Sequence, residues 1–309
     1  GKLAFALYAR GTSGVIKTVQ GDNLLVHKSI NRAGRAFLHF LNQKSVPLEE
    51  IKYLMLRYSY HTKTIVAQLL VPETNRKKLP WKKTDLESFI NQYPDIQGVL
   101  VSHSPLGVRS AETTKDFYHI GDIEIVEKVL GKKYHYHPSQ FFQIYPDAFA
   151  QILEDISDQI SLIPERNKLE LVDMFAGVGI IGLHLADQVA QVHGVEQSSL
   201  SKEYALKNAK VNNIDNFTFT ETDVDGALKY IKPDQILVID PPRSGLTKQS
   251  HAKILEALPQ HIIYISCNTE TQAADYVKLR DHYDITWSRV YNLFPKTSHV
   301  EHMIALKRK

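Results

Sequence analysis

Hydrophobic and polar positions alternate along the C-terminal half of the chain in a strand–helix–strand order. Five short apolar runs predict buried strands, separated by segments with helical spacing. These runs are residues 168–175, 189–196, 217–223, 235–242 and 261–266. Strands that alternate with helices indicate a parallel, doubly wound sheet covered by helices on both faces.

Both ends of this pattern extend the prediction. A helix over residues 146–160 is expected to lead into the sheet, and two further apolar runs at 283–295 and 301–309 predict closing strands. We therefore expect a Rossmann-like α/β domain over residues 139–309, with a mainly parallel sheet.

The first 138 residues show a different pattern, which predicts an α+β domain. Helical spacing occurs near residues 30–42 and 84–92, between strand-like runs. Those runs cover residues 53–60, 63–71, 96–103 and 123–131.

The net charge of +3 over 309 residues conceals an asymmetry between these two parts. Residues 1–138 carry 20 Lys and Arg against 12 Asp and Glu, whereas residues 139–309 carry 17 against 22. A basic N-terminal part predicts contact with a polyanion such as RNA, and an ordinary solvated surface is the alternative. The loop 75–83, "NRKKLPWKK", could hold phosphate and stack Trp81 on a base, or simply be solvated.

Composition excludes several other classes of protein. No apolar run is long enough for a membrane span, and one cysteine excludes a disulfide framework and an all-cysteine metal site. His135, His137 and His299 lack the clustering of a metal site, so packing or hydrogen-bonding roles are expected for them. We expect a cytoplasmic monomer with neither a membrane contact nor a bound metal.

Carboxylates follow four of the predicted strands. They are Asp173, Glu196, Asp223 and Asp240. Because ligands bind beyond the carboxyl ends of the strands in an open α/β sheet, we expect these acids to surround one ligand. Helix capping is the alternative for the set.

The turn after the first strand, "FAGVG", indicates which ligand. Gly177 and Gly179 let the backbone approach a ligand closely, but their spacing is not the dinucleotide pattern. Glu196 is placed to accept hydrogen bonds from both ribose hydroxyls of an adenosine, and Asp223 to meet the adenine amino group. Because the loop lacks a basic residue for phosphate, S-adenosylmethionine fits better than NAD.

The single cysteine, Cys267, follows the fifth strand in "IIYISCNTE". A free cysteine is commonly inert core filler. A thiol at a strand-to-helix turn lies near a helix N-terminus, which is expected to lower its pKa and to favour a nucleophilic thiolate.

Six short motifs together resemble the RNA uracil-C5 methyltransferases, which make 5-methyluridine in tRNA or ribosomal RNA. In order, they are "FFQ", "DMFAGVG", "GVE", "DPPR", "SCN" and "FPKTSHVE". The resemblance runs from about residue 30 to the end of the chain and is strongest over 139–309. It implies a class I methyltransferase domain there and an RNA-recognition domain over residues 1–138.

The resemblance also implies a reaction sequence. The thiolate of Cys267 would add to uracil C6, C5 would then attack the methyl group of S-adenosylmethionine, and Glu301 would remove the C5 proton before elimination. Asp240 and Arg243 would organise the turn beside the base. A uracil in folded RNA must be extruded to reach such a pocket.

By the same resemblance, Gln143, Phe175 and Asp240 contact the cofactor. Phe141 and Phe142 could stack on the extruded base or pack inside the protein. Thr269 stands where the family usually has proline, which should change the rigidity of the turn and leave the nucleophile unaffected.

Many relatives also begin with a β-barrel and a four-cysteine iron–sulfur module, neither of which this chain carries. Either it is a compact member without an iron–sulfur cluster, or it is a fragment. We expect 23S ribosomal RNA as the substrate, with the tRNA T-loop uridine as the alternative. A non-catalytic RNA-binding relative and a small-molecule methyltransferase are disfavoured, because Cys267 and Glu301 are both present and the N-terminal part is basic.

Overall fold

The structure is a computed structural model that divides into two compact units. It describes residues 3–4, 6–8, 16–18, 21–73, 79–105, 113–295, 297 and 299–309. The N-terminal unit comprises Gly1–Val126 and His137–Ser139, and the C-terminal unit comprises Glu127–Tyr136 and Gln140–Lys309. In these described ranges, every helix is too short or too polar to cross a lipid bilayer.

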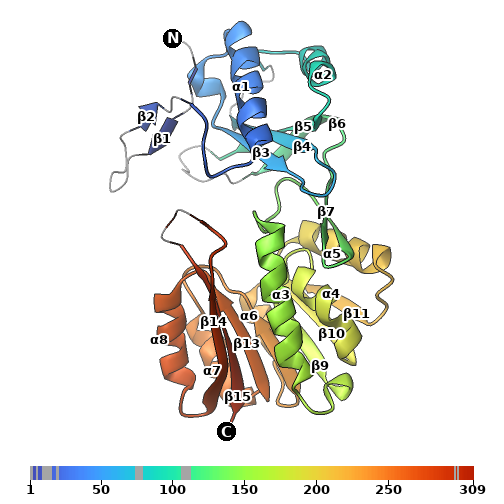
Figure 1. Cartoon of the computed structure of the whole chain (residues 1–309), viewed down its shortest axis with the longest axis vertical. Helices are drawn as coiled ribbons and strands as arrows, with labels where there is room; N and C mark the ends of the chain where they lie inside the picture. The colour runs from blue at the N-terminus through green and yellow to red at the C-terminus, as the bar shows by residue number, and fades with distance from the viewer. Residues whose placement is uncertain are drawn as a thin grey trace. The chain divides into compact units, whose positions relative to one another are not determined.

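The N-terminal unit is built on a four-stranded sheet with two helices packed on one face (Figure 1). The sheet order is β3-β4-β5-β6, in which only the central pair β4–β5 is parallel. Its elements are β1 (Ala6–Tyr8), β2 (Ile16–Thr18), α1 (Lys28–Gln43), η1 (Leu48–Glu50), β3 (Tyr53–Tyr58), β4 (Ile65–Pro72), α2 (Lys83–Gln92), β5 (Ile96–Ser104) and β6 (Lys115–Gly121).

Trp81 belongs to the core of this unit, which corrects the interpretation of its loop as a base-stacking site. Its side chain is 5% exposed and packs with the helices, and its indole nitrogen donates a hydrogen bond to Tyr118 Oη at 2.8 Å. Burying so large an apolar ring is more favourable in free energy than leaving it in solvent. Residues 75–78 of the basic loop lie outside the described residues.

The C-terminal unit contains a seven-stranded sheet, and its mainly parallel, doubly wound α/β class confirms the predicted fold class. The sheet order is β11-β10-β9-β12-β13-β15-β14, parallel from β11 to β13 and antiparallel at β15 and β14. The strands are β7 (Ile125–Val129), β8 (Lys132–Tyr136), β9 (Glu170–Met174), β10 (Gln191–Glu196), β11 (Phe217–Glu221), β12 (Gln235–Ile239), β13 (His261–Ser266), β14 (Tyr283–Tyr291) and β15 (Glu301–Arg308), of which β7 begins in the N-terminal unit and pairs with β8.

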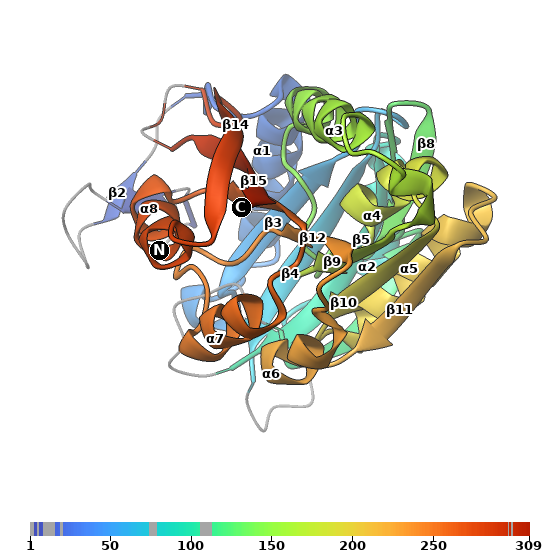
Figure 2. The ribbon, with the colours of Figure 1, turned by 90° about the horizontal axis from the view of Figure 1, so that it is seen from below.

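Helices cover both faces of this sheet, as Figure 2 shows. One layer contains α3, α4 and α5, and the other contains α6, α7 and α8. The helices are α3 (Pro146–Ser161), η2 (Arg166–Lys168), α4 (Ile180–Leu185), η3 (Ala186–Gln188), α5 (Ser199–Val211), α6 (Val224–Ala227), η4 (Leu228–Tyr230), α7 (Lys248–Ala257) and α8 (Thr269–Leu279). Burial on both faces explains why β12 reads as a continuous apolar run rather than an alternating one.

Residues 127–136 pack with the C-terminal unit, although the sequence pattern places them in the N-terminal domain. Two asparagines one turn apart on α5 hold β8 in place. Asn208 accepts a hydrogen bond from the His135 backbone N–H at 2.7 Å and donates to the His135 and Val178 carbonyls. Asn212 makes the equivalent pair of bonds with the backbone of Lys133.

We predict that Asn208→Ala lowers the free energy of unfolding by about 3 kcal/mol, because it removes three hydrogen bonds to backbone groups at a fully buried position. Asn212→Ala is the matched control at a partly exposed position, where water replaces the lost bonds, and it should cost less than about 1 kcal/mol. Urea denaturation of both variants measures the difference, and equal losses would contradict this account.

Candidate active site

One cavity of about 510 Å³ lies at the carboxyl ends of the parallel strands in the C-terminal unit. It is lined by nine of the eleven predicted site residues, which come from separate stretches of the chain. They are Gln143, Phe175, Gly177, Glu196, Asp223, Asp240, Arg243, Cys267 and Glu301. Asp173 and Gly179 are the predicted site residues that lie outside the described lining.

The turn after β9 bends sharply into the cavity because several of its residues adopt left-handed backbone conformations. Phe175, Gly177 and Gly179 have φ values of +67°, +52° and +83°. Gly179 begins α4, where an added Cβ would lie 3.1–3.4 Å from three neighbouring side chains. The turn therefore needs its glycines for shape, and only Gly177 of the two faces the cavity.

Asp173 supports this turn from below instead of facing a ligand. It is 1% exposed, and one carboxylate oxygen accepts a hydrogen bond from the Gly182 backbone N–H at 2.9 Å. Burial, reinforced by the charges of Asp240 and Glu196, raises the pKa of Asp173 to about 7. This geometry makes Asp173 a structural residue of the turn, which differs from the predicted cofactor contact.

The next two strand ends each present an acid to the cavity. Glu196 ends β10 and accepts a hydrogen bond from the Gln197 backbone N–H at 2.8 Å. Asp223 is the N-cap of α6, where its side chain accepts from the Gly226 N–H at 2.8 Å. Asp223 therefore caps a helix, which was the alternative role expected for these acids. It also lines the cavity.

Sheet topology brings the thiol and the third acid together. β13 ends immediately before Cys267, and the antiparallel β15 begins at Glu301 beside it, with Ser266 paired to His302. β12, the parallel neighbour of β13 on its other side, ends immediately before Asp240. Three adjacent strands thus deliver Asp240, Cys267 and Glu301 to one end of the cavity.

Electrostatics at this end of the cavity favour protonated groups. Burial and the charge of Asp240 raise the pKa of Glu301 to about 7, against the opposing effect of the Arg243 guanidinium. Burial alone raises the pKa of Asp240 to about 7.

The same surroundings raise the pKa of Cys267. Burial is the largest cause, and the carboxylates of Glu301 and Asp240 add to it, whereas Arg243 opposes it. The expectation of a thiolate stabilised by the N-terminus of α8 is therefore wrong for the protein without substrate. Burial and the charges of the two carboxylates raise the pKa of Cys267 by more than the N-terminus of α8 lowers it. That helix begins only after the Asn268 cap.

The two phenylalanines of "FFQ" differ in environment. Phe142 is 4% exposed and stacks on Tyr136, with ring centroids 4.3 Å apart and planes at 1°. Phe141 is 70% exposed and lines the cavity. Of the two interpretations left open, packing is therefore correct for Phe142, and stacking on a base stays a prediction for Phe141.

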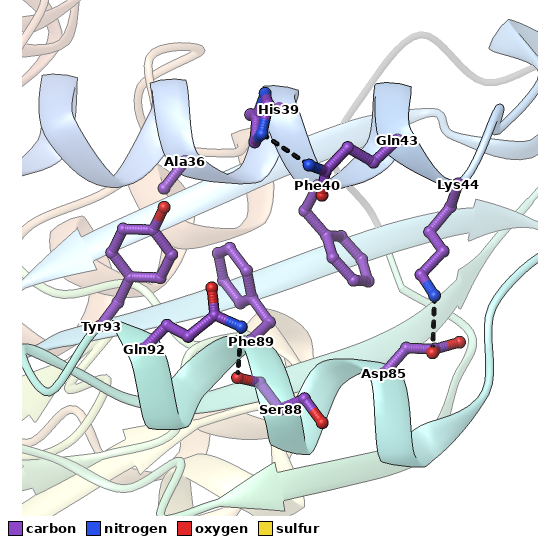
Figure 3. A pocket seen from close by; sticks show the side chains of 10 residues that line it. All are labelled: Ala36, His39, Phe40, Gln43, Lys44, Asp85, Ser88, Phe89, Gln92 and Tyr93. Carbon is purple, nitrogen blue, oxygen red and sulfur yellow. Dashed lines mark hydrogen bonds and ion pairs between the residues drawn. The ribbon is translucent and has the colours of Figure 1, made fainter.

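A second, smaller hollow of about 180 Å³ lies in the N-terminal unit between α1 and α2 (Figure 3). Phe40 and Phe89 pack at its centre, and Figure 3 shows the Lys44–Asp85 ion pair, 2.6 Å long, bridging the two helices at one end. None of the predicted site residues lines this hollow, so the C-terminal cavity is the candidate active site.

Comparison with known proteins supports this cavity as the candidate active site. Residues 224–309, which contain Asp240, Arg243, Cys267 and Glu301, match the family model described as tRNA (Uracil-5-)-methyltransferase. Residues 146–261 match a methyltransferase small domain. Over residues 224–309 the chain is therefore similar in sequence to RNA uracil-C5 methyltransferases.

The relatives that the chain matches are longer than it is. An uncharacterized RNA methyltransferase of Lactobacillus johnsonii is 31% identical over 251 residues, which cover 80% of this chain and 53% of the relative. One from Staphylococcus aureus is 27% identical over 288 residues, covering 89% of this chain and 61% of the relative. The chain thus spans little more than half the length of these relatives.

A solved structure shares the fold of this chain. The Pyrococcus abyssi tRNA (uracil-54, C5)-methyltransferase in complex with S-adenosyl-L-homocysteine superimposes with a TM-score of 0.73 at 24% identity. The match covers 94% of this chain and 70% of that one.

Sequence reasoning missed the residues that join the turn after β12, which carries Arg243, to the segment after β13, which carries Cys267. The Asn268 side chain caps α8 and also donates to the Arg243 carbonyl at 3.1 Å. Deeper inside, Asp275 of α8 accepts hydrogen bonds from the Leu246 N–H at 2.9 Å and from the Tyr264 hydroxyl at 2.7 Å. The second oxygen of Asp275 lies 2.7 Å from His251 Nε2.

Asp275 therefore fixes the turn of "DPPRSGL" to the helix that follows Cys267. It is 4% exposed, and a Cβ added at Gly245 would lie 2.6 Å from its carboxylate, which explains the glycine in that turn. The only sequence signal was an acid on the inward face of a helix, which does not reveal its distant partners.

We predict that Asp275→Asn lowers the free energy of unfolding by about 2 kcal/mol, because an amide presents donors where the carboxylate accepts hydrogen bonds from buried groups. Asp281→Asn, whose side chain is 87% exposed, makes the same chemical change and should have little effect. Denaturant titration checks both, and an unaffected Asp275→Asn protein would show that the network contributes nothing measurable.

Proposed function

We propose that the protein transfers a methyl group from S-adenosylmethionine to C5 of a uridine in structured RNA, through a covalent bond between Cys267 Sγ and uracil C6. The observation that carries this proposal is the convergence of Cys267, Glu301 and Asp240 at one end of a cavity whose other strand ends present Glu196 and Asp223. Cys267 would supply a nucleophile and Glu301 a base, whereas Glu196 and Asp223 suit a nucleoside.

The residues that line the cavity fit S-adenosylmethionine, which would supply the methyl group when bound. Glu196 and Asp223 present carboxylates suited to ribose hydroxyls and an adenine amino group, and Gly177 leaves room beside them. Phe175, Gln143 and Asp240 would complete the contacts. These assignments follow the family motifs residue by residue.

The protein groups of the reaction are one thiol, one base and one cation. Cys267 Sγ forms a bond to C6 of uracil, and C5, once it is methylated, still carries its original proton. Glu301 takes that proton, and elimination breaks the bond between Sγ and C6. Arg243 lowers the pKa of both Cys267 and Glu301, so its guanidinium stabilises the thiolate and the carboxylate on which these steps depend.

Access to the pocket requires the uracil to leave its stack in RNA. The exposed ring of Phe141 at the cavity offers a surface on which the extruded base can stack. The buried Phe142 holds this segment in place through its contact with Tyr136.

We propose 23S ribosomal RNA as the substrate, and the tRNA T-loop uridine is the second candidate. Two observations favour tRNA: the description of the matching family model and the substrate named for the Pyrococcus abyssi structure. Mapping 5-methyluridine in total RNA from a deletion strain distinguishes them. Loss from 23S RNA alone supports the first candidate, and loss from tRNA alone overturns it.

We predict that Cys267→Ala lowers the rate of methyl transfer by on the order of 10⁴-fold, because no other group can form the bond to C6. S-adenosylmethionine binding, measured by calorimetry, should stay within about twofold of the wild-type value, since Cys267 would not hold the donor. Turnover equal to wild type would refute the covalent mechanism.

We predict that Glu301→Gln traps the covalent protein–RNA adduct, visible on denaturing gels, because the C5 proton is then not removed. The wild-type rate should rise with pH through about 7, where Glu301 ionises because burial raises its pKa, and should rise further as the Cys267 thiol, whose pKa is also raised, loses its proton. Both Glu301 and Cys267 lose a proton to become active, so acid lowers the rate on both counts. A variant that turns over normally without trapped adduct would exclude Glu301 as the base.

A further inference from the structure

A cluster of aromatic rings lies at the surface of the N-terminal unit and has no role in the reaction described above. His27 stacks on Tyr58 with ring centroids 4.1 Å apart and planes at 10°. Tyr60 meets both rings edge-on, at 6.0 Å from His27 and 5.3 Å from Tyr58. All three side chains are half-buried, so part of each is accessible to solvent.

The protein holds this cluster in a fixed position from both sides. His27 is the N-cap of α1, where its Nδ1 accepts a hydrogen bond from the Ser29 N–H. Tyr58 and Tyr60 flank Ser59, which is 1% exposed and donates its hydroxyl proton to the Val126 carbonyl at 2.7 Å. Ser59 also closes the β3–β4 turn, with backbone bonds to Lys63 and Thr64.

Two lysines next to these rings are free to bind an anion. Lys28 and Lys63 are exposed and have no ion pair among the described residues. Arg32 and Arg35 on the same helix, by contrast, are paired with Asp95 and Asp22.

The two lysines also affect the protonation of His27. Burial, together with the charges of Lys28 and Lys63, lowers the pKa of His27, so its ring is neutral at physiological pH and does not repel other cations.

The segment that leads into the cluster is apolar and exposed. Leu24 and Leu25 are 79% and 56% exposed, and Val26 is 38% exposed immediately before His27. Nucleobases present flat apolar faces next to negatively charged phosphates. A fixed aromatic stack with apolar neighbours and unpaired lysines matches both properties in one place.

We propose that His27, Tyr58 and Tyr60, with Lys28 and Lys63, form a second RNA contact that stacks an unpaired nucleotide and binds its phosphates. This inference rests on the proposed RNA substrate. It assigns to the N-terminal unit a specific site, where charge alone indicated only a basic surface.

The test uses RNA binding by the full chain carrying Cys267→Ala, so that methyl transfer does not interfere. The probe is a short, fluorescein-labelled single-stranded RNA of mixed sequence. His27→Asn keeps a capping acceptor and removes the ring, and Tyr60→Leu keeps apolar volume. Together they should weaken binding about tenfold, the size of one lost stacking contact.

The lysines are tested through salt dependence. Lys28→Gln combined with Lys63→Asn, which suits the left-handed backbone at residue 63, should reduce the slope of log affinity against log salt by about 1.4. Lys168→Gln removes an exposed, already paired charge from the C-terminal unit and should leave the slope unchanged. Thermal unfolding and S-adenosylmethionine binding report that each variant is folded.

Folded ring and lysine variants that bind the probe as tightly as the parent protein would overturn the proposal. Steady-state methylation separates its failure from that of the proposed function. Ring variants in the active protein should raise KM for RNA and leave kcat within about twofold. If the wild-type protein forms no 5-methyluridine but the ring variants still lose RNA affinity, the proposed reaction fails and the RNA contact stands.

Discussion

The antiparallel pairing of β15 with β13 is the constraint on which the site depends. A parallel sheet collects the ends of its strands at one edge, whereas the beginnings of those strands lie at the opposite edge. Because β15 runs the other way, its first residue, Glu301, emerges beside the residue that follows β13, Cys267. A further parallel strand at this position would put its start at the far edge of the sheet. The reversed strand therefore supplies a carboxylate next to the thiol without a long loop.

This convergence also explains why the acids of the cavity are difficult to ionise. Withdrawal from water is the first cause of the raised pKa of Asp173, Asp240 and Glu301, each of which reaches about 7. The charge of Asp240 contributes to the raised pKa of the other two carboxyls. Arg243 is the group that opposes the shifts at Glu301 and Cys267. Its position depends on Asn268 and Asp275, which fix its turn to α8.

Features of the fold that follow from local sequence patterns could be predicted, whereas contacts between residues far apart in the sequence could not. The five parallel strands were predictable because burial on both faces leaves continuous apolar runs, and the lining acids because strand ends meet at one edge. Properties that depend on distant partners were not. The pKa of Cys267 depends on Glu301 from another strand, and Asp275 meets His251 and Tyr264 only in the folded sheet. Trp81 stands in a basic run, yet its ring enters the core.

The charge of the cavity bears on how an RNA could use it. Glu196, Asp223, Asp240 and Glu301 line it, with Arg243 as the cation among the described lining residues. Such a surface disfavours the phosphates of a dinucleotide and suits a donor with a sulfonium charge. It disfavours RNA phosphates equally, so an RNA substrate gains most if only a neutral base enters. The phosphates must then be held elsewhere, and residues 1–138 carry the excess of Lys and Arg, including the unpaired Lys28 and Lys63. Extrusion of one base separates the two requirements, since only an uncharged ring then has to enter among the carboxylates.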